Sequence, residues 1–544
     1  MSRFAFARPA AWVFPLFGLL ALVLSWPVLA VLASWLQWTP QSLDLLRQMA
    51  TTVLPDYALT SAALCLMVAL GVTVLGLGTA ATVTLFDFRG RSVFEWLLLL
   101  PLAMPAYVVA YAYTDFLQFS GPLQMALREA FGWHGALWPD VRSVWGAALV
   151  FTLSLYPYVY LLARTALLER VASLMEAARL LGAPLARRIR EVALPLSRPA
   201  VAAGVALALM ETLADFGVSS YFGIQTFTAG IYKAWLAMDD RVAAAQLATV
   251  LLAVVMVLLQ LEQRAERRMR FAQGRVSRQG TAEAQPVRLR GVQQAMAWTV
   301  CSLPVLLGFV LPVLILLRAL EGSEVDLPWA RFGDWAWNSL RLGGTTALLA
   351  VGAAVLLAFA VRQRASAWNR AVTQIVGLGY AVPGAVVVVG LLLPVGWIQH
   401  TWPQASVGAW VTATSLGLVW AYLVRFCAVA LQSMQSGYAR IPVSLDDSAR
   451  MLGVTGWGVL RQVHAPLLRR TTVAALLLVF VDVMKELPAT MVLRPFNSDT
   501  LAVVAYQLAR DERLGEAALP SLALVLVGLI PVVLLSRTLG EKRG

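Results

Sequence analysis

Charged residues are scarce in this sequence. They make up 13% of its 544 residues, while 59% are hydrophobic, and soluble domains carry about a quarter charged residues. This shortage excludes a chain that folds in water and favours the lipid bilayer as its surroundings. Lysine is nearly absent, so arginine supplies almost all of the positive charge. The basic residues lie in short stretches between apolar segments, which is typical of membrane proteins and excludes a nucleic-acid-binding groove.

Cysteine and histidine are equally rare, with three residues of each type. Cys65, Cys301 and Cys427 lie in apolar segments, and their spacing is not that of a disulfide framework or a zinc site. The sequence therefore predicts no high-affinity metal site and no catalytic residue. A Gly-x4-Gly-Lys-Ser/Thr sequence for binding phosphate is also missing. We therefore expect the chain to bind no cofactor and to leave ATP hydrolysis to another protein.

Long apolar segments dominate what is present. A membrane-spanning helix needs about 20 mostly apolar residues, and the sequence predicts an all-α fold with twelve such helices. The predicted spans are 11–36, 57–86, 93–114, 144–166, 198–221, 242–262, 293–319, 338–362, 372–396, 407–432, 471–492 and 518–538. The first run is too long for a signal-peptide core of about 7–15 residues, so we expect it to stay as the first span.

Arginine predicts the orientation of these spans. The loops near 166–198, 263–292 and 433–470 are rich in arginine, whereas the opposite loops carry several acids and fewer arginines. We therefore expect the arginine-rich loops and both termini to lie in the cytoplasm.

One segment occurs twice, at an offset of 271 residues. The first copy runs from Glu176 to Gly182 and the second from Asp447 to Gly453, and a proline follows each glycine at the same spacing, Pro195 and Pro466. Such a repeat indicates an internal duplication. It divides the chain into a first half (1–262), a polar cytoplasmic linker (263–292) and a second half (293–544).

Each copy predicts a compact helix–turn–helix. The stretch Glu-Ala-Ala-Arg-Leu-Leu has strong helix propensity, Gly182 can end that helix with a positive φ, and Pro184 is tolerated in the first turn of the next one. Pro195 is then expected to stop the second helix before the following span. A loop of this kind either docks on a partner or lies on anionic lipid, and its duplication in register favours docking.

This duplicated segment resembles the "EAA" loop of binding-protein-dependent ABC importer permeases of the bacterial inner membrane. The resemblance implies that the loops near 170–198 and 440–470 dock on two copies of a separate ATPase subunit, while a separate periplasmic protein delivers the cargo. The docking residues that it implies are Glu176, Ala177, Ala178, Gly182 and Pro195 in the first copy, and Asp447, Ser448, Ala449, Gly453 and Pro466 in the second. Because Asp447 and Ser448 replace the usual Glu and Ala, we expect the second docking contact to differ.

Four acids follow the same register inside the predicted spans. The aligned pairs are Glu211 with Asp482 and Asp215 with Glu486, and in each half the two acids are spaced i, i+4 on one helix face. A charge inside the bilayer costs at least ~2.5–3.5 kcal/mol unless it is paired or hydrated. Two interpretations stay open. The acids line a path for a hard cation, which carboxylates suit as ligands, or they pair with charges such as Lys485 and cap backbone breaks near Gly217 and Pro488.

Further segments resemble the ferric iron permeases within this importer class. They are Met210–Gly217, Thr226–Tyr232, Lys485–Thr490, Leu493–Phe496 and Asp499–Ala502. The resemblance implies uptake of Fe(III) from a periplasmic ferric-binding protein. Tyr107 and Tyr111 share a helix face and are further candidates for the path, because phenolates bind ferric iron. Aromatic residues at such positions more often belong to interfacial belts or to packing.

We therefore expect an ABC permease for Fe(III) that depends on ATP hydrolysed by its partner. A permease of the same class for thiamine, a polyamine, sulfate or a phosphonate is the first alternative, and the acid pairs disfavour anionic cargo. A twelve-helix secondary transporter that uses no ATP is the second alternative, and the duplicated loop has no counterpart in that class.

Overall fold

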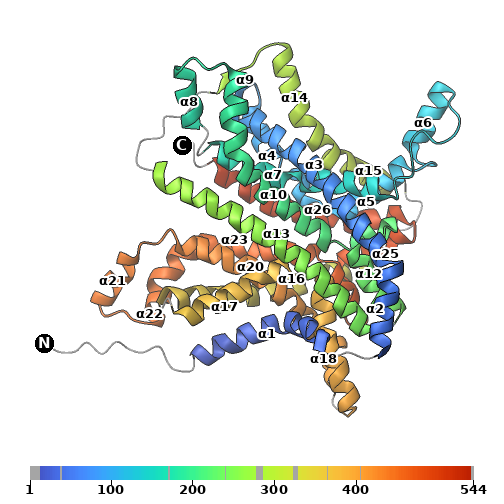
Figure 1. The fold of residues 1–544 in the computed structure, drawn as a ribbon, viewed down its shortest axis with the longest axis vertical. Helices are drawn as coiled ribbons and strands as arrows, with labels where there is room; N and C mark the ends of the chain where they lie inside the picture. The colour runs from blue at the N-terminus through green and yellow to red at the C-terminus, as the bar shows by residue number, and fades with distance from the viewer. Residues whose placement is uncertain are drawn as a thin grey trace. The chain divides into compact units, whose positions relative to one another are not determined.

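The chain is almost entirely helical where the structure describes it (Figure 1). The structure is a computed structural model, and it describes residues 13–36, 40–168, 172–238, 240–276, 286–322, 329–363, 366–404 and 406–540. Two short strands, β1 (Phe86–Asp87) and β2 (Val287–Arg288), pair in parallel. The predicted all-α fold is therefore confirmed.

Ten helices of the described ranges are long and apolar enough to cross a membrane, or eleven if one bent pair counts as a span. The elements that carry the ten are α1 (Val13–Ala33), α3 (Leu54–Leu85), α7 (Val144–Ala166), α10 (Leu194–Ala214), α13 (Arg241–Val276), α14 (Val292–Val305) continued by α15 (Leu311–Glu321), α16 (Trp329–Gln363), α18 (Gly384–Thr401), α20 (Ser415–Tyr438) and α26 (Leu514–Gly540). The predicted span 471–492 corresponds to α23 (Ala465–Lys485). This helix has the length of a span but is not among the ten, and it carries Arg469, Arg470, Asp482 and Lys485.

Two predicted spans are broken by proline. The span predicted at 93–114 consists of Arg91–Ala103 and Ala106–Phe131, which meet at an angle of 88°. The span predicted at 372–396 is likewise divided into α17 (Ala367–Gly377), a 3₁₀ turn and α18. Pro105 and Pro383 cap the second helix of each pair, because proline lacks the N–H that would continue the preceding helix.

The described residues form two compact units, which do not follow the predicted division of the chain. Unit 1 comprises the described parts of Met1–Trp38 and Trp329–Val503, and unit 2 those of Thr39–Pro328 and Val504–Gly544. Helix α1 thus packs with the second half of the sequence, on α17, α18 and α20. Conversely, α14 and α15 lie in unit 2, where α15 packs on α26 and on α5 (Ala106–Leu117).

Small residues allow the helices within each unit to approach closely. In unit 2, α7 packs against α3 and α10, and a side chain at Gly204 of α10 would lie 2.7 Å from the backbone of Val159 on α7. In unit 1, a side chain at Gly390 of α18 would collide with the carbonyl of Pro27 on α1. Such contacts are typical of membrane helices, whose association depends on close packing because lipid removes the hydrophobic driving force.

The duplication is visible in the register of the helices. Four helices of the first half begin 271 residues before their counterparts, and their ends agree with that offset to within one residue: α7 and α20, α8 (Ala172–Leu180) and α21 (Val443–Met451), α10 and α23, and α11 (Gly217–Phe222) and α24 (Pro488–Leu493). The gapless repeat found in the sequence therefore corresponds to a repeated structure, and equivalent residues of the two halves can be compared directly.

The described parts of the predicted linker at 263–292 include a helix and a strand. Helix α13 continues to Val276, well beyond the predicted end of its span, and Val287–Arg288 pairs with Phe86–Asp87. An exposed ion pair between Arg288 and Asp87 (3.7 Å) accompanies this pairing. Residues 277–285 of the predicted linker lie outside the described residues.

Candidate functional site

The first duplicated loop forms a helix–turn–helix. Helix α8 ends at a turn, and α9 (Leu185–Arg188) leads on into α10. Gly182 has a φ of +78°, and the N–H of Ala183 donates to the carbonyl oxygen of Ala178 at 3.0 Å. This hydrogen bond beside a left-handed residue is a Schellman motif, which closes the helix and requires glycine at the turn.

The second loop repeats this geometry. Gly453 follows α21 with a φ of +81°, and the N–H of Val454 donates to the carbonyl oxygen of Ala449 at 2.9 Å. In Figure 1, α21 and α22 (Trp457–Val459) lie at one end of the long helices of unit 1. The two loops therefore share a fold in detail and not only in sequence.

The expectation that Pro195 stops a helix is wrong, and its counterpart Pro466 does not stop one either. Both lie in the first turn of a span, α10 and α23. The preceding turns, Ile189–Ala193 and Leu460–His464, are π-helical. A π turn widens the helix, and this gives the proline ring room where its missing N–H and its bulk would otherwise break the chain. The loop is thus continuous with the span behind it.

Each loop exposes a pair of large apolar side chains just before its glycine. The exposed fractions are 80% for Leu180, 87% for Leu181, 88% for Met451 and 84% for Leu452. Exposed apolar groups at matching positions are typical of a surface that a partner covers. Behind each pair, the acid of the motif binds the arginine of the motif: Glu176 pairs with Arg179 at 3.5 Å and Asp447 with Arg450 at 3.2 Å. The change from Glu to Asp preserves this ion pair.

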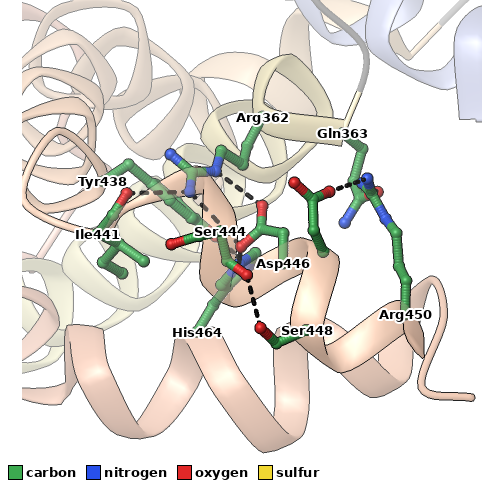
Figure 2. A network of polar contacts seen from close by, with 10 residues as sticks. Arg362, Gln363, Tyr438, Ile441, Ser444, Asp446, Ser448, Arg450 and His464 are labelled. Carbon is green, nitrogen blue, oxygen red and sulfur yellow. Dashed lines mark hydrogen bonds and ion pairs between the residues drawn. The ribbon is translucent and has the colours of Figure 1, made fainter. Parts of the chain in front are cut away.

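A buried polar network, which the sequence did not predict, holds the second loop (Figure 2). Asp446, in the first turn of α21, is 2% exposed and accepts from Nε of Arg362 at 2.8 Å. Its other oxygen is joined to Nε2 of the fully buried His464 at 2.9 Å. Arg362 also donates to the carbonyl oxygen of Ile441 at 2.9 Å, and Tyr438 meets His464 Nδ1 at 3.4 Å. Residues from α16 and from the π turn before α23 thus bind one carboxylate, and Tyr438 of α20 contacts the histidine.

The first loop has an apolar contact at the same place. The equivalents of Asp446 and His464 are Met175 and Ala193, both buried. The repeat alignment could have indicated this network, because a methionine and an alanine in the first copy are aligned with an acid and a histidine in the second. Burial alone would raise the pKa of Asp446, but the hydrogen bonds from Arg362 and His464 outweigh it and hold that pKa below its usual 3.8.

The second acid of each pair stands at the end of its helix. Helices α10 and α23 end at Ala214 and Lys485, and the C-cap residues Asp215 and Glu486 have helical φ (−72° and −69°) but extended ψ (133° and 124°). A helical φ leaves each side chain at its helical position, so the i, i+4 pairs share a face, and the backbone leaves the helix directly after the second acid. Glu211 and Asp482 remain on their helices, about one turn earlier, and both are half-buried.

Glu486 is fully engaged inside unit 1. It is 5% exposed and binds Nη1 of Arg425 at 3.3 Å. Its two carboxylate oxygens accept from the backbone N–H of Ala489 (2.9 Å) and of Thr490 (3.0 Å), and the Thr490 hydroxyl donates to it at 2.7 Å. Tyr422 completes the set, 2.6 Å from the same hydroxyl. The contacts are those of a charge pair that also caps the short helix α24.

Asp215 has a sparser environment in unit 2. Its carboxylate accepts from the backbone N–H of Val218 at 2.8 Å and from that of Ser219. Within the described ranges it forms no ion pair with an arginine or lysine. Glu486, at the equivalent position of the other half, has an arginine partner as well as its backbone hydrogen bonds.

Tyr107 and Tyr111 are buried in unit 2. Their rings are 5.7 Å apart, and the ring of Tyr111 also lies 4.7 Å from that of Tyr221 and 6.5 Å from that of Tyr506. The Tyr506 hydroxyl is 2.7 Å from Ser220 Oγ. The hydroxyl of Tyr111 has no hydrogen-bond partner among the described residues. No group of three or more His, Cys, Asp or Glu side chains in that part of the chain is arranged to hold a metal ion.

Comparison with known proteins places these features in a family. Residues 72–271 match the binding-protein-dependent transport system inner membrane component family. The Fe(3+)-transport system permease protein FbpB 2 of Haemophilus influenzae is 24% identical over 97% of this chain and 99% of its own length. A probable ABC transporter permease protein, y4fN of Sinorhizobium fredii, is 24% identical over 87% of this chain and 86% of its own.

A third relative matches only part of the chain. The putative 2-aminoethylphosphonate transport system permease protein PhnV of Salmonella typhimurium is 29% identical over 38% of this chain and 77% of its own length. The family match covers the first loop and its spans, and the second half repeats them in register. The chain therefore contains a domain of the binding-protein-dependent transport system inner membrane component family, and the relatives that match most of its length are named as permeases of ABC and Fe(3+) transport systems.

Proposed function

We propose that this chain is the permease of an ABC importer that takes up Fe(III) handed over by a periplasmic binding protein. The observation that carries the choice of cargo is the ferric permease relative, which matches over nearly the full length of both chains and thus over both repeats. Oxygen groups, namely a half-buried carboxylate and several phenols, lie near the helix breaks of unit 2. Hard trivalent cations prefer such ligands.

The two loops are the proposed docking sites for two copies of the ATPase. Both present the same Schellman turn, the same ion pair and an apolar pair exposed by 80% or more. Each is continuous with the span behind it. A movement of the ATPase that pushes on the loop is therefore passed directly to α10 or α23. We propose the two repeats as the halves 1–262 and 293–544, with the loops and both termini in the cytoplasm, as the arginine distribution favours.

Docking is tested at the exposed apolar pairs. Leu181→Asp and Leu452→Asp each place a charge where a partner would cover an apolar side chain, so we expect loss of ATPase co-purification with the protein still inserted in the membrane. Leu181→Met and Leu452→Met preserve the apolar surface and serve as matched controls. Normal co-purification of both Asp variants would show that the loops are not the docking surface.

The cargo is tested by uptake of radioactive iron into cells that lack the gene. We expect the gene to restore uptake of Fe(III), and an excess of 2-aminoethylphosphonate to leave that uptake unchanged. The phosphonate is the relevant competitor because one relative, matched over part of the chain, bears its name. Restored phosphonate uptake without iron uptake would replace Fe(III) as the cargo.

A further inference from the structure

The helix break after α10 and the break after α23 are built alike but filled differently. The gapless register pairs Asp215 with Glu486, Ser219 with Thr490, and Ser154 with Arg425. The pairs lie on or beside equivalent helices, because α7, α10 and α11 begin 271 residues before α20, α23 and α24. The two breaks can therefore be compared position by position.

In unit 1 a guanidinium group fills the space in front of the acid. Arg425 reaches Glu486 at 3.3 Å, and Thr490 Oγ1 donates to the same carboxylate at 2.7 Å. A side chain at Gly384 would lie 3.2 Å from Glu486 Oε1 and 3.4 Å from Arg425 Nη1, so the chain on the other side is also in close contact. The positive charge that Glu486 needs is thus resident in the protein.

In unit 2 a serine stands where unit 1 has the arginine, and several hydroxyl groups have no hydrogen-bond partner among the described residues. Ser154 is 3% exposed and Ser219 is 0% exposed. The hydroxyl oxygens of both have no hydrogen-bond partner among the described residues, and neither has that of the fully buried Tyr111. Buried polar groups are nearly always satisfied by protein, water or an ion, so three such hydroxyls in one region call for a ligand.

These hydroxyls belong to elements that meet Asp215. Helix α11, which carries Ser219, packs on both α5 and α7, the helices of Tyr111 and Ser154. Asp215 interacts electrostatically with Tyr111 and with Tyr506. The region therefore combines one carboxylate with several neutral oxygen groups, and it lacks the guanidinium that its counterpart contains.

The geometry points to a hard metal cation in unit 2, at the place that the Arg425 guanidinium takes in unit 1. Its oxygen ligands are Asp215, Ser154, Ser219 and Tyr111. Carboxylate, hydroxyl and phenol oxygens suit hard cations and not soft ones. The assignment of this cation as transported Fe(III) rests on the proposed function, whereas the site itself rests on the comparison of the two repeats.

The site is expected once per chain and not twice. Counted from Pro105 and Pro383, which precede α5 and α18, Tyr107 and Tyr111 correspond to Ala385 and Val389. The second half therefore has no phenol at these two positions, its Tyr422 is bound to Thr490, and Arg425 occupies the space before the acid. Bound metal is expected at one ion per chain.

The test uses Tb(III), a hard trivalent ion whose luminescence is excited through nearby aromatic rings, on the purified full chain. We expect Ser219→Ala and Asp215→Asn to weaken Tb(III) binding by about tenfold or more, the scale of losing a group that holds or orients a metal. Thr490→Ala is the matched control at the same position of the other repeat and is expected to bind Tb(III) as the unchanged protein does. Ser154→Arg supplies the missing guanidinium and is expected to abolish both Tb(III) binding and iron uptake.

The outcomes separate the site from the function. The site is supported if Ser219→Ala weakens Tb(III) binding and Thr490→Ala leaves it unchanged, even if the cells take up no iron. Equal binding by Asp215→Asn, Ser219→Ala and the unchanged protein refutes it, even if iron uptake is normal. Size-exclusion profiles identify any variant that misfolds. If Ser154→Arg misfolds, the comparison of Ser219→Ala with Thr490→Ala still decides whether the site exists. A visible phenolate–Fe(III) band that disappears in Tyr111→Phe would support Tyr111 as a ligand, and a band unchanged in that variant would refute that role.

Discussion

Removing the carboxylate of Asp446 should loosen the second docking loop and leave the first one intact. In Asp446→Ala, Arg362 retains only the carbonyl oxygen of Ile441 from its contacts in this network, and Nε2 of His464 loses its carboxylate. Removing one partner of a buried ion pair costs about 3–5 kcal/mol. The Arg362 side chain is 15% exposed and can recover some hydration. We therefore expect about 3 kcal/mol, at the lower end of that range.

Hydrogen exchange measures this loss locally. A loss of about 3 kcal/mol corresponds to about a hundredfold faster exchange if the loop opens as a unit, since 1.4 kcal/mol is a factor of ten. The acceleration is expected in α21 (Val443–Met451). Helix α8 is an internal control, because the buried Met175 takes the place of the acid in the first loop. ATP hydrolysis should then continue with less iron imported per ATP, because α21 no longer moves with α16 and α23.

Two further variants separate charge from shape. Asp446→Asn preserves the size of the side chain and loses its charge, and we expect a smaller effect, since hydrogen bonds to charged groups are worth about 1.5–3 kcal/mol and neutral ones about 0.5–1.5 kcal/mol. The double variant Asp446→Met with His464→Ala copies the first loop and should recover part of the protection. Unchanged exchange of α21 in Asp446→Ala would refute the reasoning, because a carboxylate with these contacts would then contribute nothing to the position of the loop.

Three other predictions follow from the same contacts. Because its pKa is depressed, Asp446 should stabilise the loop fully above the unfolded pKa near 3.8 and lose that effect as the pH falls through the lower folded pKa. Hydrogen exchange of α21 should therefore show no carboxylate titration between pH 5 and 8. A titration midpoint of the Asp446 carboxylate in that range would contradict the prediction. Gly182→Ala should destabilise the first loop by about 1–2 kcal/mol because a Cβ is strained at a φ of +78°, whereas Gly352→Ala, in an open position on α16, should not, and equal thermal unfolding of the two would count against the strained turn. Arg425→Leu should cost about 3–5 kcal/mol by leaving Glu486 buried without its partner, and Arg425→Leu with Glu486→Leu should recover most of it; a double variant as unstable as the single one in thermal unfolding would show that the pair is not the cause.

The apolar pattern of the sequence predicted most spans, and it was wrong where the backbone breaks. The segment 144–166 coincides with α7, and 338–362 lies within α16, which begins nine residues earlier at Trp329, because a long apolar run leaves few alternatives to a membrane helix. The run at 198–221 instead ends at Ala214, and the run at 471–492 ends at Lys485. Hydropathy averaged over a long window does not register such breaks, since the few acids at each break are outnumbered by the apolar residues around them.

Contacts between distant segments were beyond the reach of local patterns. Nothing in residues 13–33 indicates that α1 packs on α18 and not on the helices that follow it in sequence, since the choice is made by shape, as at Gly390 and Pro27. His464 was likewise one of three scattered histidines until Asp446, 18 residues earlier, came within 2.9 Å of it. The short π turn before Pro466 brings the histidine inward, and no residue type signals that turn.

The repeat supplies the comparison that single positions lack. A buried acid is ambiguous by itself, because it can hold the fold together or hold a ligand. Glu486 resolves one case, since arginine, threonine and two backbone N–H groups satisfy it. Asp215 has the same place in the other half without the arginine, and the hydroxyls of Ser154 and Ser219 have no hydrogen-bond partner among the described residues. The two breaks thus differ in one resident charge, because Arg425 fills the break in unit 1 and Ser154 stands at its place in unit 2. A transporter needs only one such break to meet its cargo, and the closed one is free to stabilise the half that carries it.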